Sequence, residues 1–149
     1  MRSRRGFTMV EMAIAITVGL ILLGIAHSAF GEVQNRFASQ QGLQVFQSLH
    51  ARARAQAVEG GVMTQLWVHS AGDSAWITRR GQTLETIRFD DELGVEIVTE
   101  PSFFRLCMSP RGFADTDCNS FTGTAKLEFS QGLNARTVAI LQSGQLVFP

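Results

Sequence analysis

The sequence lacks the residue patterns on which most enzymes and metalloproteins depend. It contains no G-x-S-x-G turn, no phosphate-binding glycine loop and no C-x-x-C pair. Its three histidines, His27, His50 and His69, stand far apart and do not have metal-ligand spacing. We therefore expect a chain that is not an enzyme and that holds no metal and no cofactor.

Charge is also scarce, and it is unevenly distributed. Charged residues make up 17% of the 149 residues, and the formal net charge is zero. Residues 1–6 hold three arginines and no acid, which leaves 13 acidic residues against 10 basic ones in the remainder. Nucleic-acid binding needs a basic surface, so the mildly acidic body argues against a nucleic-acid partner.

Residues 7–31 form a long apolar run in which Glu11 is the one formal charge. As a helix, this run would extend about 36 Å, enough to cross a hydrocarbon core of ~30 Å. The arginines before it predict a cytoplasmic N-terminus, with everything after residue 31 outside the cytoplasm. The alternative is a cleaved secretory signal peptide, but the run is long for one and contains a glutamate.

The stretch "GFTMVE" at residues 6–11 resembles the type IV prepilin signature. The match comprises a short basic leader ending at Gly6, then Phe7, and Glu11 five residues into the mature chain. This resemblance implies that a prepilin peptidase cuts between Gly6 and Phe7, and that the new amine of Phe7 is methylated. Residues 1–6 would be the leader, and residues 7–31 the transmembrane helix and later the filament core.

The resemblance also suggests a role for Glu11 in assembly. A carboxylate at the bilayer centre costs on the order of 2.5–3.5 kcal/mol, so an unpaired one favours docking into a filament. Cleavage would create a positive amine on Phe7, at the positive end of the helix dipole and four residues before Glu11. We expect this amine, or that of a neighbouring subunit, to pair with Glu11. The alternative is a polar residue that is tolerated near the membrane interface.

The pattern beyond residue 31 predicts an α+β fold. An amphipathic helix continues over residues 32–59, and its apolar stripe should pack on the domain that follows. Residues 60–149 should form a globular antiparallel β domain, because short β-prone runs alternate there with turn formers. The apolar stripe comprises Phe37, Leu43, Phe46, Leu49, Ala53 and Ala57. The eight predicted strands are 62–68, 75–80, 84–89, 95–98, 103–108, 125–129, 137–141 and 145–148.

Two blocks narrow the resemblance to the GspH/FimT class of minor pilins and pseudopilins. They are an "L…AR..A" pattern at the helix end, from Leu49 to Ala57, and a glycine turn at Gly144-Gln145. The class implies a non-catalytic H-like subunit that helps initiate or cap a type II secretion pseudopilus or a type IV pilus. Its partners would be the prepilin peptidase, other minor and major pilins or pseudopilins, and membrane lipid before assembly.

Two other pilin functions remain as alternatives. DNA-binding minor pilins of uptake pili tend to carry a basic "GR.R" turn near the C-terminus, whereas this chain has no arginine after Arg136. Nothing in the sequence excludes a major pilin.

The exported part of the chain holds both cysteines, Cys107 and Cys118. An even count outside the cytoplasm favours a disulfide, with two free thiols as the alternative. Between and after them, "DTDCN" resembles the start of a calcium loop. Ser120 and Lys126 occupy positions where that loop needs Gly and Glu, so we interpret the segment as a solvated acidic turn. Trp67 and Trp76, in neighbouring predicted strands, are interpreted as core residues.

Overall fold

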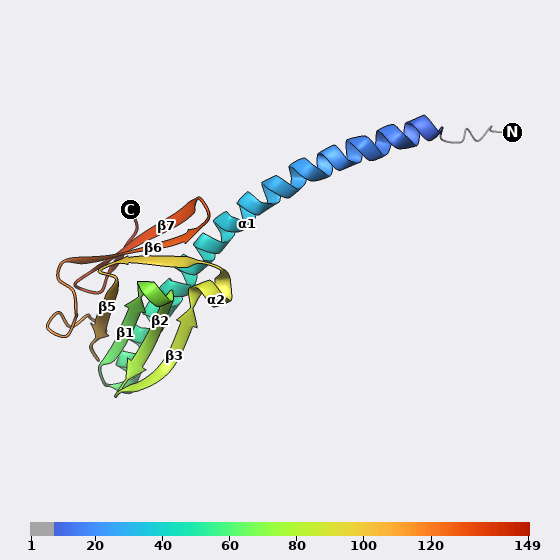
Figure 1. Ribbon diagram of the computed structural model, residues 1–149. Coiled ribbons are helices and arrows are strands. Elements are labelled where there is room, and N and C mark those ends of the chain that lie inside the picture. Colours follow the sequence, from blue (N-terminus) through green and yellow to red (C-terminus); the bar gives the residue numbers. More distant parts are fainter. Residues whose placement is uncertain (1–7) are drawn as a thin grey trace. The chain divides into compact units, whose positions relative to one another are not determined.

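The chain begins with one long helix and continues into β-structure (Figure 1). The computed structural model describes residues 8–149, except for the side chains of residues 27–29. The predicted cleavage residues, Gly6 and Phe7, lie outside the described residues. Helix α1 spans Met9–Gly60, close to the helix predicted over residues 7–31 and 32–59. It ends where Gly61 adopts a left-handed conformation with a φ of 60°, which stops a helix without the strain that a side chain would cause.

The chain divides into two compact units, Met1–Gln34 and Asn35–Pro149. Within the first unit, the described part of α1 presents apolar side chains all round, and the large ones from Met9 to Ile25 are 50–93% exposed. This stretch makes α1 long and apolar enough to cross a membrane, by length and composition.

The second unit contains two four-stranded antiparallel sheets and the later half of α1 (Figure 1). Sheet A has the strand order β3-β2-β1-β5, and sheet B has the order β4-β6-β7-β8. All eight strands overlap the eight runs predicted from the sequence. Their bounds are β1 Thr64–His69, β2 Ser74–Arg79, β3 Gln82–Arg88, β4 Glu96–Glu100, β5 Phe103–Met108, β6 Thr124–Gln131, β7 Asn134–Leu141 and β8 Leu146–Val147.

One hydrophobic core joins the helix stripe to the inner faces of both sheets. Phe46, Leu49, Ala53 and Ala57 are fully buried, as the spacing predicts. The helix packs on sheet B through Phe46, whose ring centroid lies 5.6 Å from that of Phe129 on β6. One prediction is wrong: Phe37 is 67% exposed, because it lies on a different face of the helix from Ala38 and Ser39, which continue the buried stripe.

Two short helices interrupt the strands. The η1 turn, Ser70–Gly72, links β1 to β2, and α2, Phe89–Leu93, follows β3. The acidic residues 90–92 form part of α2. Three carboxylates in its first turn stabilise α2 by their favourable interaction with the helix dipole. Glu92 also accepts a hydrogen bond from the Arg88 backbone N–H. Gly94 ends α2 in a left-handed conformation with a φ of 64°.

The two tryptophans are not core residues, contrary to the sequence interpretation. Trp67 and Trp76 are half-buried and lie opposite each other on β1 and β2, on the face of sheet A that points away from the core. Alternation explains their position, because their strand neighbours Leu66 and Ile77 are buried. Both strands contain apolar residues on each face, so the sequence pattern alone did not reveal which face is the inner one.

Candidate assembly site

Glu11 and Thr8 form a reciprocal capping box at the start of α1. The Thr8 backbone N–H and hydroxyl donate to the Glu11 Oε2 atom at 2.9 and 3.0 Å. In return, the Glu11 backbone N–H donates to the Thr8 Oγ1 atom at 3.3 Å. A Thr followed three residues later by a Glu is the sequence signature of this box. The stretch "TMVE" carries that signature and belongs to the prepilin-like match, but no capping role was predicted for Thr8.

This box positions the Glu11 carboxylate in the first turn of the helix, where the dipole favours a negative charge. The side chain remains exposed, so it is accessible to a further cation. The Phe7 amine lies outside the described residues. The pairing of that amine with Glu11 therefore stays a prediction, as do cleavage after Gly6 and methylation of Phe7.

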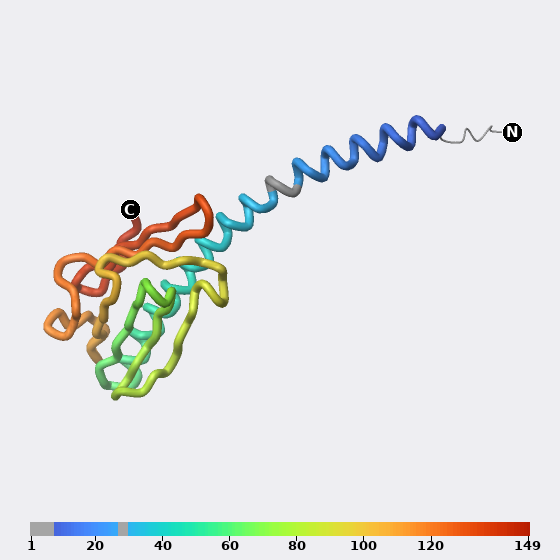
Figure 2. Tube along the Cα trace, in the orientation of Figure 1, coloured from blue at the N-terminus to red at the C-terminus, as the bar shows by residue number. Residues whose placement is uncertain are grey.

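The disulfide between Cys107 and Cys118 is present, as the sequence predicts. Cys107 is fully buried on β5, and the loop that follows this strand covers it. Figure 2 shows this loop as an irregular segment that leads from β5 towards β6. The covalent link therefore holds the loop against one end of sheet A.

Polar side chains of the same loop form structural hydrogen bonds. Asn119 accepts a bond from the Cys107 backbone N–H at 2.9 Å and donates to the Gln142 carbonyl oxygen at 3.0 Å. Asp115 accepts a bond from the Asp117 backbone N–H. Because Asn119 is occupied in this way, the solvated-turn interpretation fits better than a calcium site. Among the described side chains, those of residues 8–26 and 30–149, no group of three or more His, Cys, Asp or Glu residues is placed to hold a metal ion.

The helix end and the C-terminal hairpin meet at His50. Its Nε2 atom lies 3.0 Å from the Gly144 carbonyl oxygen, and because a carbonyl can only accept, Nε2 carries the proton. Burial lowers the pKa of His50, the bond to Gly144 raises it in part, and the positive charge of Arg54 lowers it further. The sequence predicts no role for this histidine; the signal for one is its position one residue after Leu49, beside the buried stripe.

Gly144 itself is a close contact point. It has a φ of 82°, and a Cβ atom there would lie 2.8 Å from the Ala114 Cβ atom. The predicted glycine turn therefore has two structural reasons, a left-handed backbone and the proximity of the disulfide loop. His50, Gly144 and the loop together line a groove of about 560 Å³.

Comparison with known protein families gives a match at the N-terminal end of the chain. Residues 1–26 match the prokaryotic N-terminal methylation motif. A search among curated proteins finds no match.

Comparison with solved structures concerns the fold. The chain is similar to two crystal forms of the type IV minor pilin FimU of Pseudomonas aeruginosa. In space group P21 the TM-score is 0.58 at 14% identity, over 76% of this chain and 90% of that one. In space group P65 the TM-score is 0.54 at 13% identity, over 74% and 91%.

The N-terminal end of the chain is type IV prepilin-like. The fold of the chain is that of the minor pilin FimU, in which a long N-terminal apolar helix packs on antiparallel β-structure, as the predicted α+β class requires. The motif and the apolar helix of this chain indicate membrane anchoring and incorporation into a pilus. The motif likewise implies processing by a peptidase and assembly with other pilins.

Proposed function

We propose that the chain is a non-catalytic minor subunit of a type IV pilus or of a type II secretion pseudopilus, of the GspH/FimT class. The observation that carries this proposal is the combination of a methylation motif at residues 1–26 with a minor-pilin fold beyond it. The motif contains the expected processing site, and the same helix continues into a β domain with the minor-pilin fold. A subunit of this kind would help to initiate or cap the filament.

The domain roles follow from this proposal. Residues 1–6 are the leader, 7–31 the membrane anchor and filament core, 32–59 the amphipathic continuation, and 60–149 the globular body. Before assembly, the chain crosses the inner membrane once, with its N-terminus in the cytoplasm and its body in the periplasm. The arginines before Gly6 support this orientation.

The likeness to FimU supports a pilus more than a pseudopilus, because FimU is a type IV minor pilin. The two alternatives from the sequence, a DNA-binding minor pilin and a major pilin, gain no specific support from the fold. The arginines among the described residues all belong to the second unit, where they are spread over several elements, and the segment from Leu141 to Val147 carries none.

Intact mass of the membrane-extracted protein tests this function. We expect a mature chain that begins at Phe7 and carries one methyl group on its amine. Sheared filaments are then collected from cells that lack the pilus genes and from cells that lack the type II secretion genes. The chain should be absent from the filament fraction of the strain that lacks its own machine. A chain that starts near residue 29, or one that retains Met1, contradicts the proposal.

A further inference from the structure

The outer face of sheet A carries aromatic and cationic side chains that have no part in the proposed cleavage, methylation or membrane anchoring. The strand register arranges its side chains in rows across the sheet. The first row, from β3 to β5, is Arg88, Ser74, His69 and Phe103, and the second is Thr86, Trp76, Trp67 and Arg105. We call these eight residues the aromatic face.

Four rings of the aromatic face contact one another. The Trp67 and Trp76 rings are stacked, with centroids 6.1 Å apart and planes 6° apart. The Phe103 ring lies 5.5 Å from Trp67 and 5.5 Å from His69, and its side chain is 45% exposed. A contiguous group of rings on a protein surface marks an interaction site more often than isolated apolar residues do.

A cation completes this face and is rigidly positioned. The Arg105 guanidinium lies 5.2 Å from the Trp67 ring centroid. Its Nε and Nη2 atoms donate to the Cys118 carbonyl oxygen at 3.1 and 2.8 Å. Arg105 is therefore fixed between the disulfide loop and a ring, and it loses little side-chain freedom when a partner binds.

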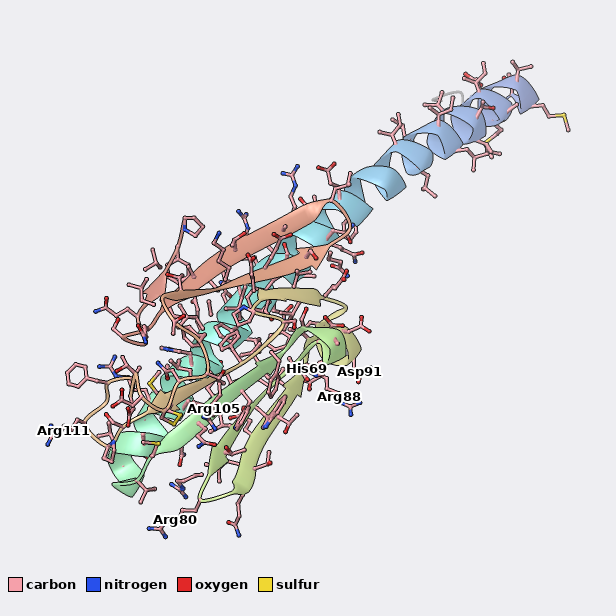
Figure 3. All side chains as sticks on the ribbon, turned by 60° about the vertical axis from the view of Figure 1, so that its left-hand side comes forward. His69, Arg80, Arg88, Asp91, Arg105 and Arg111 are labelled. Atoms are coloured by element: carbon pink, nitrogen blue, oxygen red, sulfur yellow. A yellow bond between two sulfur atoms is a disulfide. The ribbon has the colours of Figure 1, made fainter. Side chains whose placement is uncertain are left out.

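The charge of the aromatic face is positive. Figure 3 labels His69, Arg88 and Arg105 on the strands of sheet A, and Asp91 close to Arg88. Asp91 belongs to α2 and pairs with Arg88 at 3.2 Å, at the border of the face. None of the eight residues is acidic. The face therefore suits a partner that is acidic and that offers an apolar centre to the rings.

Sheet B of the same chain presents such a surface on its own outer face. Glu96, Glu100 and Glu128 are exposed there, with Lys126 as the one cation among their β4 and β6 neighbours. Within the part of the chain that the structure describes, these three carboxylates form no salt bridge. At their centre, Val98 lies opposite Glu128 and is 50% exposed. We call these five residues the acidic face.

We propose that the aromatic face of one copy of this chain docks on the acidic face of a second copy. Opposite charges at the borders would set the orientation, and Trp, Phe and Arg at the centre have the composition of protein-interface hot spots. The two faces differ, so the contact is heterologous and leaves a free face on each copy. The proposal deepens the proposed function and rests on it in one respect, that a filament subunit needs lateral contacts.

A single-stranded nucleic acid is the competing occupant, because rings beside arginines can also stack bases. Charge decides against it here. Residues 35–149 contain eleven carboxylates and ten basic side chains, and the aromatic face itself has only two arginines. Electrostatic capture of a phosphate backbone needs a more extended basic groove.

Photo-crosslinking of the full chain in detergent micelles tests the contact. Benzoylphenylalanine replaces Thr86, which is exposed on the aromatic face, and light and heavy-isotope chains are mixed so that links between two copies are recognised by mass. We expect links from residue 86 to peptides containing Glu96 or Glu128. The matched control places the same group at Leu133, which is fully exposed at the β6–β7 turn, and should give no such link.

Charge reversal gives the second measurement on the same full chain. Arg88→Glu alone and Glu128→Lys alone should each lower the yield of the residue-86 link by about tenfold, the effect of losing one good contact. When the two variants are mixed, the aromatic face of the Arg88→Glu chain meets the acidic face of the Glu128→Lys chain, and the charges are again opposite. Much of the yield of the residue-86 link should return between these two chains. Arg111→Glu, in the disulfide loop, is the control and should change nothing.

The outcomes separate the alternatives. Absence of the link in a folded, disulfide-bonded chain, or links to other elements, overturns the docking proposal. So does binding of a fluorescent oligothymidine at physiological salt that Arg105→Ala abolishes, because it would assign the face to nucleic acid. The N-terminal mass of the same sample is read in parallel. A missing link with normal cleavage after Gly6 refutes the docking alone, whereas a link on an uncleaved chain refutes the proposed function alone.

Discussion

His50 on helix α1 donates a hydrogen bond from Nε2 to the carbonyl oxygen of Gly144, 94 residues further along the chain. This bond ties the middle of the buried helix stripe to the turn between β7 and β8. Both partners belong to the same unit, so the bond is part of the folding of the β domain.

Stability should therefore depend on pH through His50. Burial lowers the pKa of His50 below its ordinary value of 6.5, so the unfolded chain binds a proton that the native chain resists. The free energy of unfolding should be constant above about pH 7 and should fall as the pH drops below 6.5. Urea unfolding between pH 5 and pH 7, followed by the fluorescence of Trp67 and Trp76, measures this.

His50→Gln is the matched variant for this test, because it keeps an N–H donor near Gly144 but does not titrate. We expect it to unfold with much less pH dependence over the same range. An unchanged slope would assign the pH dependence to other groups.

Substitutions of Glu11 separate its role in capping from its role in pairing. Glu11→Gln keeps a side chain that can complete a capping box with Thr8, whereas Glu11→Leu removes the box and the charge. If a buried ion pair with the Phe7 amine drives assembly, both variants should be cleaved and should then fail to enter filaments, since breaking such a pair commonly costs ~3–5 kcal/mol.

Sheared-filament fractionation, with cleavage checked by mass, distinguishes the outcomes. Incorporation of Glu11→Gln but not Glu11→Leu would mean that the capping box, and not the charge, is what assembly requires. Thr8→Ser is the control, because serine caps a helix as threonine does and should assemble normally.

Removal of the disulfide should loosen the loop after β5 and leave α1 intact. Cys107→Ser with Cys118→Ser should lower the free energy of unfolding by about 3 kcal/mol in the chain-entropy view. Hydrogen exchange should increase over residues 109–120, where the Cys118 carbonyl anchors Arg105. Unchanged exchange in that segment would show that its hydrogen bonds hold it without the covalent link.

Gly144→Ala should be more destabilising than an alanine at another left-handed glycine. Both Gly144 and Gly123 have a φ near 80°, so a side chain is strained at either position. A Cβ atom at Gly123 would meet nothing within 4 Å, whereas one at Gly144 would lie 2.8 Å from Ala114. We expect Gly144→Ala to lower the thermal midpoint further than Gly123→Ala, and equal effects would mean that the disulfide loop can yield.

Much of this fold could be predicted because local patterns agree with the final packing. The spacing of Phe46, Leu49, Ala53 and Ala57 defines a helix face, and this face is fully buried. Each of the eight strands is bounded by turn formers, so its position is a local property. The disulfide followed from the number of cysteines and the expected compartment.

What could not be predicted depends on contacts between distant segments. The sequence did not divide the strands into two sheets, because sheet pairing such as that of β1 with β5 depends on the whole topology. Nor did it show that Trp67 faces outward, since β1 contains apolar residues on both of its faces. At the assembly site, the opposite happened: the Thr8–Glu11 box is a local signal that was present in the sequence and was overlooked.

The packing of the helix stripe into a core shared with both sheets has a mechanical consequence. Tension that pulls on α1 near Asn35 enters the β unit through Phe46, Leu49, Ala53 and Ala57, which pack into the shared core. Their burial means that the load is borne in shear along many side chains at once. The Arg52–Glu85 salt bridge at 2.7 Å and the His50–Gly144 bond add cross-links on the same helix. Under tension, the helix should therefore leave the β unit only when all the buried side chains of the stripe slide past the core together, and not when one contact breaks.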